Sequence, residues 1–305
     1  MRASNEVRAV VAAGGLGTRV HHWARYLPKE FYPVGGRPGI AWILEEIAGL
    51  GAGRVVIVYH PYYRAFTEWA GHALSHSGQT GYRRAAGWPI ADRWTTGGRR
   101  ISFIAQHGRY GDLTSVLNGA DHFPAAGDLY VAFADNLYFG PNPLRALRNV
   151  PPGQVAVVAR PYQSELAAQR GVIATVECDG RRLVAGLTEK PSPSAARALE
   201  QRHGARNLLL LEGWARVTAD FIRFARTFPI APDVEPKLAL AIGAYAATHP
   251  VVTVETSCEV IDLGAPVCRC ERSQLSHGQD LRPPGRDDLR RPLSRPGVVN
   301  GDHDT

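Results

Sequence analysis

A pattern of strand, helix and strand across residues 7–59 constrains the fold of this chain more than any other feature. Residues 7–12 form a short apolar run that ends in a glycine-rich turn, which is typical of a buried parallel strand followed by a loop. Pro38 opens a run whose apolar residues recur at helical spacing up to Gly51, and a β-branched strand is expected at 54–59. The pattern predicts a right-handed βαβ unit, the building block of an open parallel sheet.

The alternation of strands and helices continues to about residue 255. Further strands are expected at 128–134, 154–159, 172–177, 183–188, 207–211 and 251–255, and helices at 219–227 and 237–248. This alternation predicts an α/β fold. In such sheets ligands bind beyond the carboxyl ends of the strands, so the turns after Ala12 and Ala134 are the first candidates for a binding site.

Composition separates a folded region from a tail. The chain has 305 residues, of which 45% are hydrophobic and 21% charged, enough to bury a large core. From about residue 268 the sequence is rich in Arg, Pro, Gly, Ser and Asp and has no periodicity, which is typical of a disordered tail, although such tails also bind partners. We therefore expect one folded domain at 1–267 and a disordered polar tail at 268–305.

Charge, hydropathy and cysteine spacing exclude several classes of protein. The net charge of +7 comes from scattered arginines with no basic run interleaved with aromatics, so a small anionic substrate explains it as well as a nucleic acid would. No apolar run approaches the roughly 20 residues that span a bilayer, and no secretory signal opens the chain, so we expect a cytoplasmic protein without membrane or nucleic-acid partners. The cysteines (Cys178, Cys258, Cys268 and Cys270) lack paired spacing, which predicts free thiols.

The first loop carries the sequence Ala12-Ala13-Gly14-Gly15-Leu16-Gly17-Thr18-Arg19. Three glycines in four positions let backbone N–H groups approach a phosphate chain closely, although a glycine loop alone fits a tight turn equally well. A dinucleotide fingerprint would need glycine or alanine at Val20, and a P-loop would need Gly-Lys-Ser/Thr. The loop is therefore of a third kind.

A second motif, Leu27-Pro28-Lys29-Glu30-Phe31-Tyr32-Pro33, follows this loop. Together the two resemble the signature of the sugar-1-phosphate nucleotidyltransferase family, and the Lys29-Glu30 pair is most similar to its glucose-1-phosphate uridylyltransferase branch. The resemblance extends over about residues 7–266 and implies a Rossmann-like mixed, mostly parallel sheet flanked by helices. It also implies that Arg19 and Lys29 are catalytic, and that the nucleotide is bound by loop residues Ala13, Gly14, Gly15, Gly17 and Thr18.

The segment that begins at Gln106 resembles the base-reading segment of that family, which implies that Gln106, Gly111 and Asp112 also bind the nucleotide. The paired donor and acceptor of a glutamine amide suit the edge of a base. Asp112 departs from the uridylyl pattern. It fits an N-cap for a helix beginning at Leu113, which we favour, or an acceptor for the N–H groups of guanine.

The remaining motifs resemble the metal and sugar sites of the family. Asp135, in Phe133-Ala134-Asp135-Asn136, and Asp262, in Ile261-Asp262-Leu263-Gly264, are implied to bind Mg²⁺, which prefers such hard oxygen ligands. Gly171, Glu189 and Lys190 are implied to bind the sugar phosphate. Gly213 and Glu235 match the sugar pocket and an acidic position before a helix more loosely.

These residues predict a magnesium-dependent enzyme that joins a nucleoside triphosphate to a sugar 1-phosphate and releases pyrophosphate. The default pair is UTP with glucose 1-phosphate. The alternatives are a guanylyl- or thymidylyltransferase for another sugar or cyclitol phosphate, or a non-catalytic relative that binds sugar nucleotides. The sequence leaves open whether the chain forms a homo-oligomer.

Overall fold

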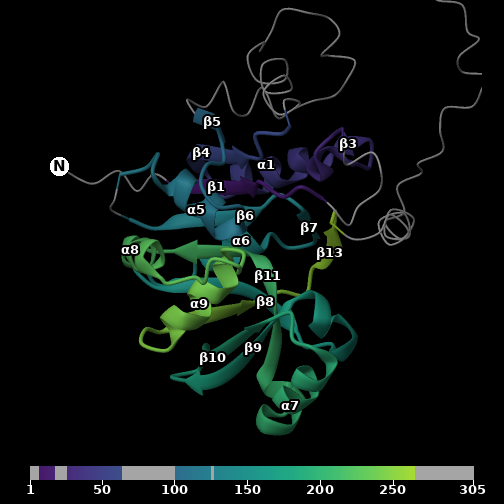
Figure 1. Cartoon of the computed structure of the whole chain (residues 1–305), viewed down its shortest axis with the longest axis vertical. Helices are drawn as coiled ribbons and strands as arrows, with labels where there is room; N and C mark the ends of the chain where they lie inside the picture. The colour runs from purple at the N-terminus through teal and green to yellow at the C-terminus, as the bar shows by residue number, and fades with distance from the viewer. Residues whose placement is uncertain (1–6, 18–25, 64–99, 125–126, 265–305) are drawn as a thin grey trace, which may run out of the picture.

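A nine-stranded sheet runs through the computed structural model, which describes residues 7–17, 26–63, 100–124 and 127–264 (Figure 1). Its strands lie in the order β5-β4-β1-β6-β11-β8-β12-β10-β9. In chain order they are β1 (Val7–Ala13), β4 (Ala52–Tyr59), β5 (Arg100–Ala105), β6 (Leu129–Phe133), β8 (Val155–Pro161), β9 (Gly171–Cys178), β10 (Arg181–Glu189), β11 (Leu208–Val217) and β12 (Val251–Glu255).

The two halves of this sheet differ in strand direction. In the N-terminal half β5, β4, β1 and β6 pair in parallel. In the C-terminal half β8 and β12 pair in parallel, whereas β11, β10 and β9 join antiparallel to their neighbours. Because β11 also pairs with β9, the pairings of β11, β8, β12, β10 and β9 form a closed circuit. The predicted α/β class with a mixed sheet is confirmed.

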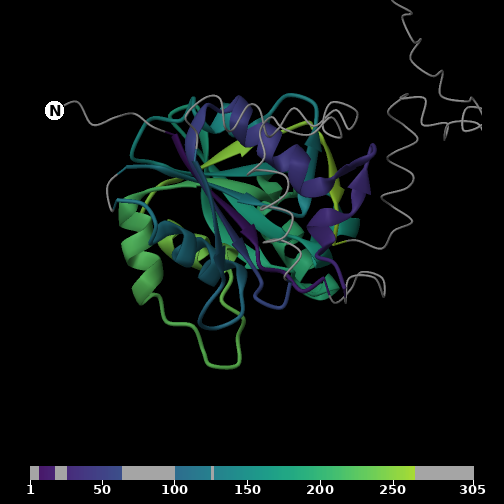
Figure 2. The same cartoon turned by 90° about the horizontal axis from the view of Figure 1, so that it is seen from above.

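Helices cover both faces of the sheet (Figure 2). On one face, α1 (Gly39–Gly49) and α6 (Pro143–Leu147) contribute to one cluster of buried apolar residues. On the other face, α5 (Asp112–Ala120), α8 (Ala219–Thr227) and α9 (Leu238–Ala246) contribute to a second. Successive β1 residues alternate between the clusters, Val10 in one and Val11 in the other, because strand side chains point to opposite faces.

Smaller elements complete the fold. They are the 3-10 helices η2 (Lys29–Phe31), η3 (Ser164–Gln169) and η4 (Ala205–Asn207), the helix α7 (Pro193–His203), and the short strand pairs β2 (Pro33–Val34) with β3 (Arg37–Pro38) and β7 (Asn136–Phe139) with β13 (Glu259–Asp262). The β7–β13 pair places Asp262 opposite Asn136. Because Asp135 directly precedes Asn136, this pairing brings Asp135 and Asp262, which are far apart in the sequence, to the same edge of the fold.

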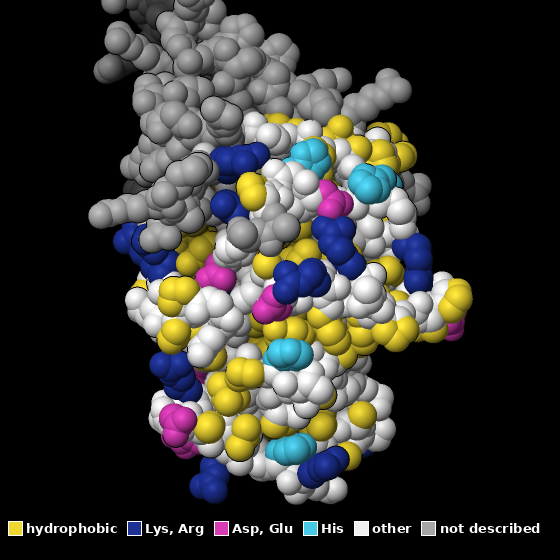
Figure 3. Space-filling model, turned by 90° about the vertical axis from the view of Figure 1, so that its left-hand side faces the viewer, with side chains coloured by type: hydrophobic (Ala, Val, Ile, Leu, Met, Phe, Trp, Pro, Cys, Tyr) yellow, Lys and Arg dark blue, Asp and Glu magenta, His cyan; other side chains and the backbone are white. Residues whose placement is uncertain are grey.

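The surface mixes charge and apolar groups. On the face drawn in Figure 3, lysines and arginines are interspersed with acidic and apolar side chains rather than gathered in one stripe. Within the described ranges, no helix combines the length and the apolar character needed to cross a membrane. Cys178 is exposed and Cys258 buried, and both are free thiols as expected. Cys268, Cys270 and the tail predicted at 268–305 lie outside the described residues.

Candidate active site

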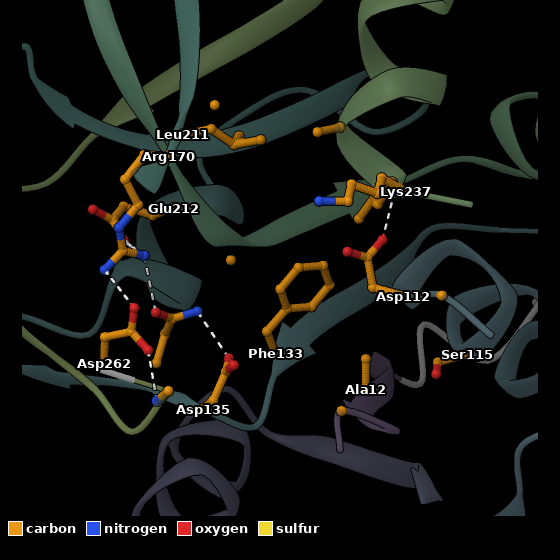
Figure 4. Close-up of a pocket in the computed structure, with 18 of the residues that line it drawn as sticks. Ala12, Asp112, Ser115, Phe133, Asp135, Arg170, Leu211, Glu212, Lys237 and Asp262 are labelled. Carbon is orange, nitrogen blue, oxygen red and sulfur yellow. Dashed lines mark hydrogen bonds and ion pairs between the residues drawn. The ribbon is translucent and has the colours of Figure 1, made fainter. Parts of the chain in front are cut away.

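A cavity of about 490 Å³ opens at the carboxyl ends of β1 and β6, where the topology of the sheet predicts a ligand. The backbone of Ala134 bonds to Ala12, which brings the ends of these two strands together. Glycine-loop residues and the β5–α5 loop line one end, and β9, β10 and β11 line the other (Figure 4). The volume is in the range of small-molecule sites.

The glycine loop is packed so closely that it excludes side chains. A Cβ at Gly14 would lie 2.1 Å from Gln106 Oε1 and 2.7 Å from Ser115 Oγ. The Gln106 amide accepts a hydrogen bond from Ser115 at 2.8 Å and donates one to the Gly111 carbonyl at 3.2 Å. Gln106 therefore supports the loop from behind the cavity, and its reading of a base stays a prediction.

Two tyrosines hold the peptide groups of Leu16 in this loop. The Tyr63 hydroxyl donates to the Leu16 carbonyl at 2.8 Å, and the Leu16 N–H donates to the Tyr110 hydroxyl at 3.2 Å. Tyr63 follows β4, whereas Tyr110 belongs to the β5–α5 loop. Segments from two different strands thus fix the orientation of the peptides that flank Gly15 and Gly17.

Lys29 lies in η2 beneath this loop and forms an ion pair with Asp135. A Cβ at Gly15 would lie 2.9 Å from its Nζ. Burial by itself would lower the pKa of Lys29, but the carboxylates of Asp135, Glu30 and Asp262 outweigh burial and raise it. Burial likewise opposes ionisation of Asp135, but Lys29 and Arg170 lower its pKa. Both groups are therefore charged at neutral pH.

Glu30, the neighbour of Lys29, is a buried carboxyl group that lines the cavity. Burial raises its pKa to about 8, although the positive charge of Lys29 acts in the opposite direction. Among the described residues, no donor bonds to its Oε2. The buried carboxyl group of Glu30 is thus a weaker acid than that of an exposed glutamate.

Asp135 and Asp262 converge at the turn that follows β13. A Cβ at Gly264 would lie 3.0 Å from Asp262 Oδ1, 3.7 Å from Asp135 Oδ2 and 3.8 Å from Lys29 Nζ. Only a glycine leaves this space open, and carboxylate oxygens border it on two sides. The space and its oxygen donors suit a small, hard divalent cation.

Arg170 connects this acid pair to the opposite end of the cavity. Its guanidinium pairs with Asp262 at 3.3 Å and with the buried Glu212 at 3.4 Å, and it donates to Asn136 Oδ1 at 3.1 Å. Glu212 also pairs with Arg160 at 2.9 Å. Burial opposes the charge of Arg170, but the surrounding acids raise its pKa.

The predicted sugar-phosphate residues lie together at that end. A Cβ at Gly171, the first residue of β9, would lie 3.2 Å from Glu189 Oε2. Lys190 has a left-handed φ of 45°, and its N–H bonds to the Arg170 carbonyl at 3.1 Å. Glu189 accepts a hydrogen bond from Lys237 Nζ at 3.1 Å. Glu189 is thus oriented by a lysine from the segment before α9.

The structure corrects the predicted role of Asp112 as an N-cap. Helix α5 begins at Asp112 itself, and its N-cap position is Gly111, without a side-chain cap bond. Asp112 Oδ1 instead accepts the N–H of Leu238 at 2.6 Å, at the start of α9. Asp112 therefore caps a helix far along the chain, and burial raises its pKa to about 7.

The cavity thus brings together most of the predicted site residues. Those that line it are Gly14, Gly15, Gly17, Lys29, Gly111, Asp112, Asp135, Gly171, Glu189, Lys190, Gly213, Glu235 and Asp262. Ala13 and Gln106 lie behind it. Thr18 and Arg19 lie outside the described residues. Other lining residues had no role predicted from the sequence, among them Glu30, Asn136, Arg170, Glu212 and Lys237.

Comparison with known families gives an independent view. The family model of the MobA-like NTP transferase domain matches residues 9–217. UDP-glucose pyrophosphorylase in complex with UDP-glucose has a similar structure, with a TM-score of 0.73 at 18% sequence identity. The likeness covers 89% of this chain and 98% of that one. The UTP-bound enzyme from Acinetobacter baumannii has a TM-score of 0.69 at 19% identity over 90% and 93% of the two chains. At such identities the likeness establishes the fold.

Curated relatives also align at the sequence level. The UTP–glucose-1-phosphate uridylyltransferase of Staphylococcus haemolyticus is 24% identical over 199 residues, which are 62% of this chain and 67% of that protein. The CMP-5'-(3-aminopropyl)phosphonate synthase of Streptomyces rubellomurinus is 45% identical over 65 residues, 21% of this chain. This alignment spans only 10% of the length of the synthase. An alignment with the bifunctional protein GlmU of Paramagnetospirillum magneticum likewise spans only 12% of that protein's length.

Proposed function

Because this chain belongs to the MobA-like NTP transferase domain family, we propose that it condenses a nucleoside triphosphate with a sugar 1-phosphate and releases pyrophosphate. UTP and glucose 1-phosphate are the pair we propose first. One observation carries the proposal: a single cavity has the glycine loop and Lys29 at one end, Gly171, Glu189 and Lys190 at the other, and two carboxylates between them. Both substrates would meet at those carboxylates.

The proposed chemistry needs no nucleophile from the protein. An oxygen of the sugar phosphate, already anionic at neutral pH, forms a bond to the α-phosphorus of the triphosphate. The bond from that phosphorus to the bridging oxygen breaks, and pyrophosphate leaves with its electron pair. The barrier is largely the repulsion between two polyanions, so positioning and positive charge supply most of the acceleration.

The cations of the cavity suit this task. The loop amides and Arg19 would bind the departing pyrophosphate, Lys29 the α-phosphate and Lys190 the incoming sugar phosphate. Asp135 and Asp262 would hold Mg²⁺, which when bound supplies further positive charge to the phosphates. Glu189, oriented by Lys237, would accept hydrogen bonds from sugar hydroxyls.

The substrate pair is identified by measuring pyrophosphate release. The purified chain with Mg²⁺ is incubated with UTP, dTTP, GTP, ATP and CTP, each with a panel of sugar and cyclitol 1-phosphates. We expect the fastest release with UTP and glucose 1-phosphate. Faster release with GTP or dTTP would assign the alternative base, and no release from folded protein that still binds nucleotide would assign the non-catalytic alternative.

Replacement of Lys29 tests the catalytic assignment. Lys29→Ala removes a buried positive charge aimed at the loop, so we expect kcat to fall by about 10²-fold to 10³-fold, the effect typical of losing one preorganised charge-stabilising group. Lys237→Met removes a lysine from the opposite end of the cavity and serves as a control, with a smaller effect on kcat. Near-normal turnover of Lys29→Ala would contradict the assignment.

A further inference from the structure

The acid pair of the cavity is already bound by the protein's own cations. Asp135 pairs with Lys29 through Oδ2, and its Oδ1 accepts a hydrogen bond from Asn136 at 3.1 Å. Asp262 pairs with Arg170 through Oδ2, and its Oδ1 accepts the Gly264 N–H at 2.7 Å. All four carboxylate oxygens therefore have partners, and two of those partners are positively charged.

Lys29 lies between the acid pair and the glycine loop. Its Nζ pairs with Asp135, yet it lies only 2.9 Å from the position of a Cβ at Gly15. A phosphate bound by the loop amides would thus lie within reach of the same ammonium group. Because the four-carbon stem of a lysine is flexible and both positions lie close to its Nζ, a small movement of the Lys29 side chain is enough to exchange one anion for the other.

We propose that Lys29 and Arg170 keep the acid pair closed to a divalent cation until a nucleoside triphosphate draws Lys29 onto its phosphates. Asp135 then becomes a ligand for the cation that enters with the nucleotide. This regulation of the site rests on the proposed function, since it requires a triphosphate at the glycine loop.

The charges around the acid pair oppose binding of a cation before the nucleotide binds. A divalent cation that approaches the space beside Gly264 meets the ammonium group of Lys29 and the guanidinium of Arg170, both largely buried, where like charges repel more strongly than in water. The fully ionised triphosphate carries several negative charges against the single one of Asp135, and competes for Lys29. By linkage, the nucleotide must then raise the affinity for the cation, and the cation the affinity for the nucleotide, by the same factor.

Binding of Mn²⁺ tests the proposal without any measurement of activity. Electron paramagnetic resonance of free Mn²⁺ gives its dissociation constant for the wild type and for Lys29→Met. We expect Lys29→Met to bind Mn²⁺ alone at least about tenfold more tightly, because the competing charge is gone. Lys237→Met, which removes a lysine paired with Glu189 rather than with the acid pair, should match the wild type.

A second variant covers the risk that Lys29→Met does not fold. Arg170→Met frees Asp262 and should also tighten Mn²⁺ binding, and circular dichroism identifies which variants are folded. If neither variant, once folded, binds Mn²⁺ more tightly than the wild type does, the proposal is overturned.

The coupling is measured by repeating the titrations with saturating UTP, after correction for Mn²⁺ bound to UTP in solution. UTP should tighten Mn²⁺ binding to the wild type at least about tenfold and have much less effect on Lys29→Met. An equal effect on both proteins would overturn the proposal. A wild type that binds no nucleotide at all would count against the proposed function, whereas Mn²⁺ binding without nucleotide still decides whether Lys29 closes the site.

Discussion

At the scale of single residues, the hydroxyls of Tyr63 and Tyr110 set the direction of the glycine-loop peptides. We expect Tyr63→Phe and Tyr110→Phe each to raise the KM for the nucleotide by about 3-fold to 10-fold, the value of one hydrogen bond, with a smaller change in kcat. Steady-state kinetics at saturating sugar phosphate measure both constants. Tyr62→Phe, which changes a neighbouring exposed tyrosine, is the control.

Gly213 lies where its neighbours leave no room for a side chain. A Cβ there would lie 2.5 Å from Asn136 Nδ2 and 2.9 Å from Phe133 Cβ, so Gly213→Ala must displace atoms that line the cavity. We predict that the KM for the sugar phosphate rises about tenfold, as expected for overpacking that costs 1–3 kcal/mol. The KM for the nucleotide should stay near its wild-type value, and Gly186→Ala, where a Cβ meets open space, should change neither.

Site residues can be predicted from the sequence when they belong to a recognisable motif or follow a predicted strand. Lys29 belongs to a motif, and Asp135 follows a strand, so both were found, and the structure places them in contact. Arg170 and Glu212 have ordinary neighbours in the sequence, and they come together where the pairing of β11 shifts register after Leu211, next to the start of β9. A charged residue beside a motif glycine, as Arg170 is beside Gly171, is the one signal that could have pointed to this pair.

At the scale of elements, Asp112 links the start of α5 to the start of α9, and its pKa gives this link a pH dependence. Because burial raises the pKa of Asp112 to about 7, the folded chain keeps a proton that the unfolded chain releases near pH 4. Asp112 therefore lowers the free energy of unfolding as the pH rises from about 4 to about 7, by at most about 1.4 kcal/mol per pH unit.

Asp112→Asn should remove this dependence. The asparagine oxygen can still accept the Leu238 N–H, but it carries no charge. We expect the free energy of unfolding of the variant, relative to the wild type, to increase by about 1 kcal/mol or more between pH 5 and pH 8. Urea denaturation at a series of pH values measures it. A constant difference across this range would show that Asp112 ionises normally.

Elements with a strong apolar pattern were predicted best. Helix α8 begins and ends where expected, because Thr218 caps it by accepting the Phe221 N–H and Phe221 and Ala225 are buried. Helix α7 was missed, because Ala196 is its only buried residue and the helix has no apolar stripe. Strands β7 and β13 are only four residues long, so they depend on each other rather than on a local pattern.

At the scale of the whole molecule, the cavity lies between the parallel and the mixed halves of the sheet. A ligand that reaches from the glycine loop to Glu189 would contact both halves, whereas a nucleotide alone or a sugar phosphate alone would contact mainly one. We therefore predict that, at equal ligand concentration, UDP-glucose raises the melting temperature more than UTP or glucose 1-phosphate does, because contacts with both halves give it the lower Kd and stabilisation grows with the ratio of concentration to Kd. Differential scanning calorimetry with each ligand measures these shifts.

The cavity is also where two distant loops are joined. Arg109, in the β5–α5 loop, donates hydrogen bonds to the carbonyls of Ile230, Ala231, Pro232 and Val234, at distances from 2.5 to 3.1 Å. The Leu113 N–H bonds to the Pro236 carbonyl at 3.1 Å, beside the bond from Leu238 to Asp112. The segment beside the glycine loop and the segment that carries Lys237 therefore form one bonded unit.

This bonded unit limits how either of its two segments can be exchanged for that of a relative. A loop transplanted from a relative to change the preferred base would leave the carbonyls of 230–234 without their arginine and would disturb the start of α9. The donor's version of both segments has to be grafted at once, and a library that randomises them separately would sample mostly mismatched pairs. Preferences for the two proposed substrates would accordingly change together under selection rather than one at a time.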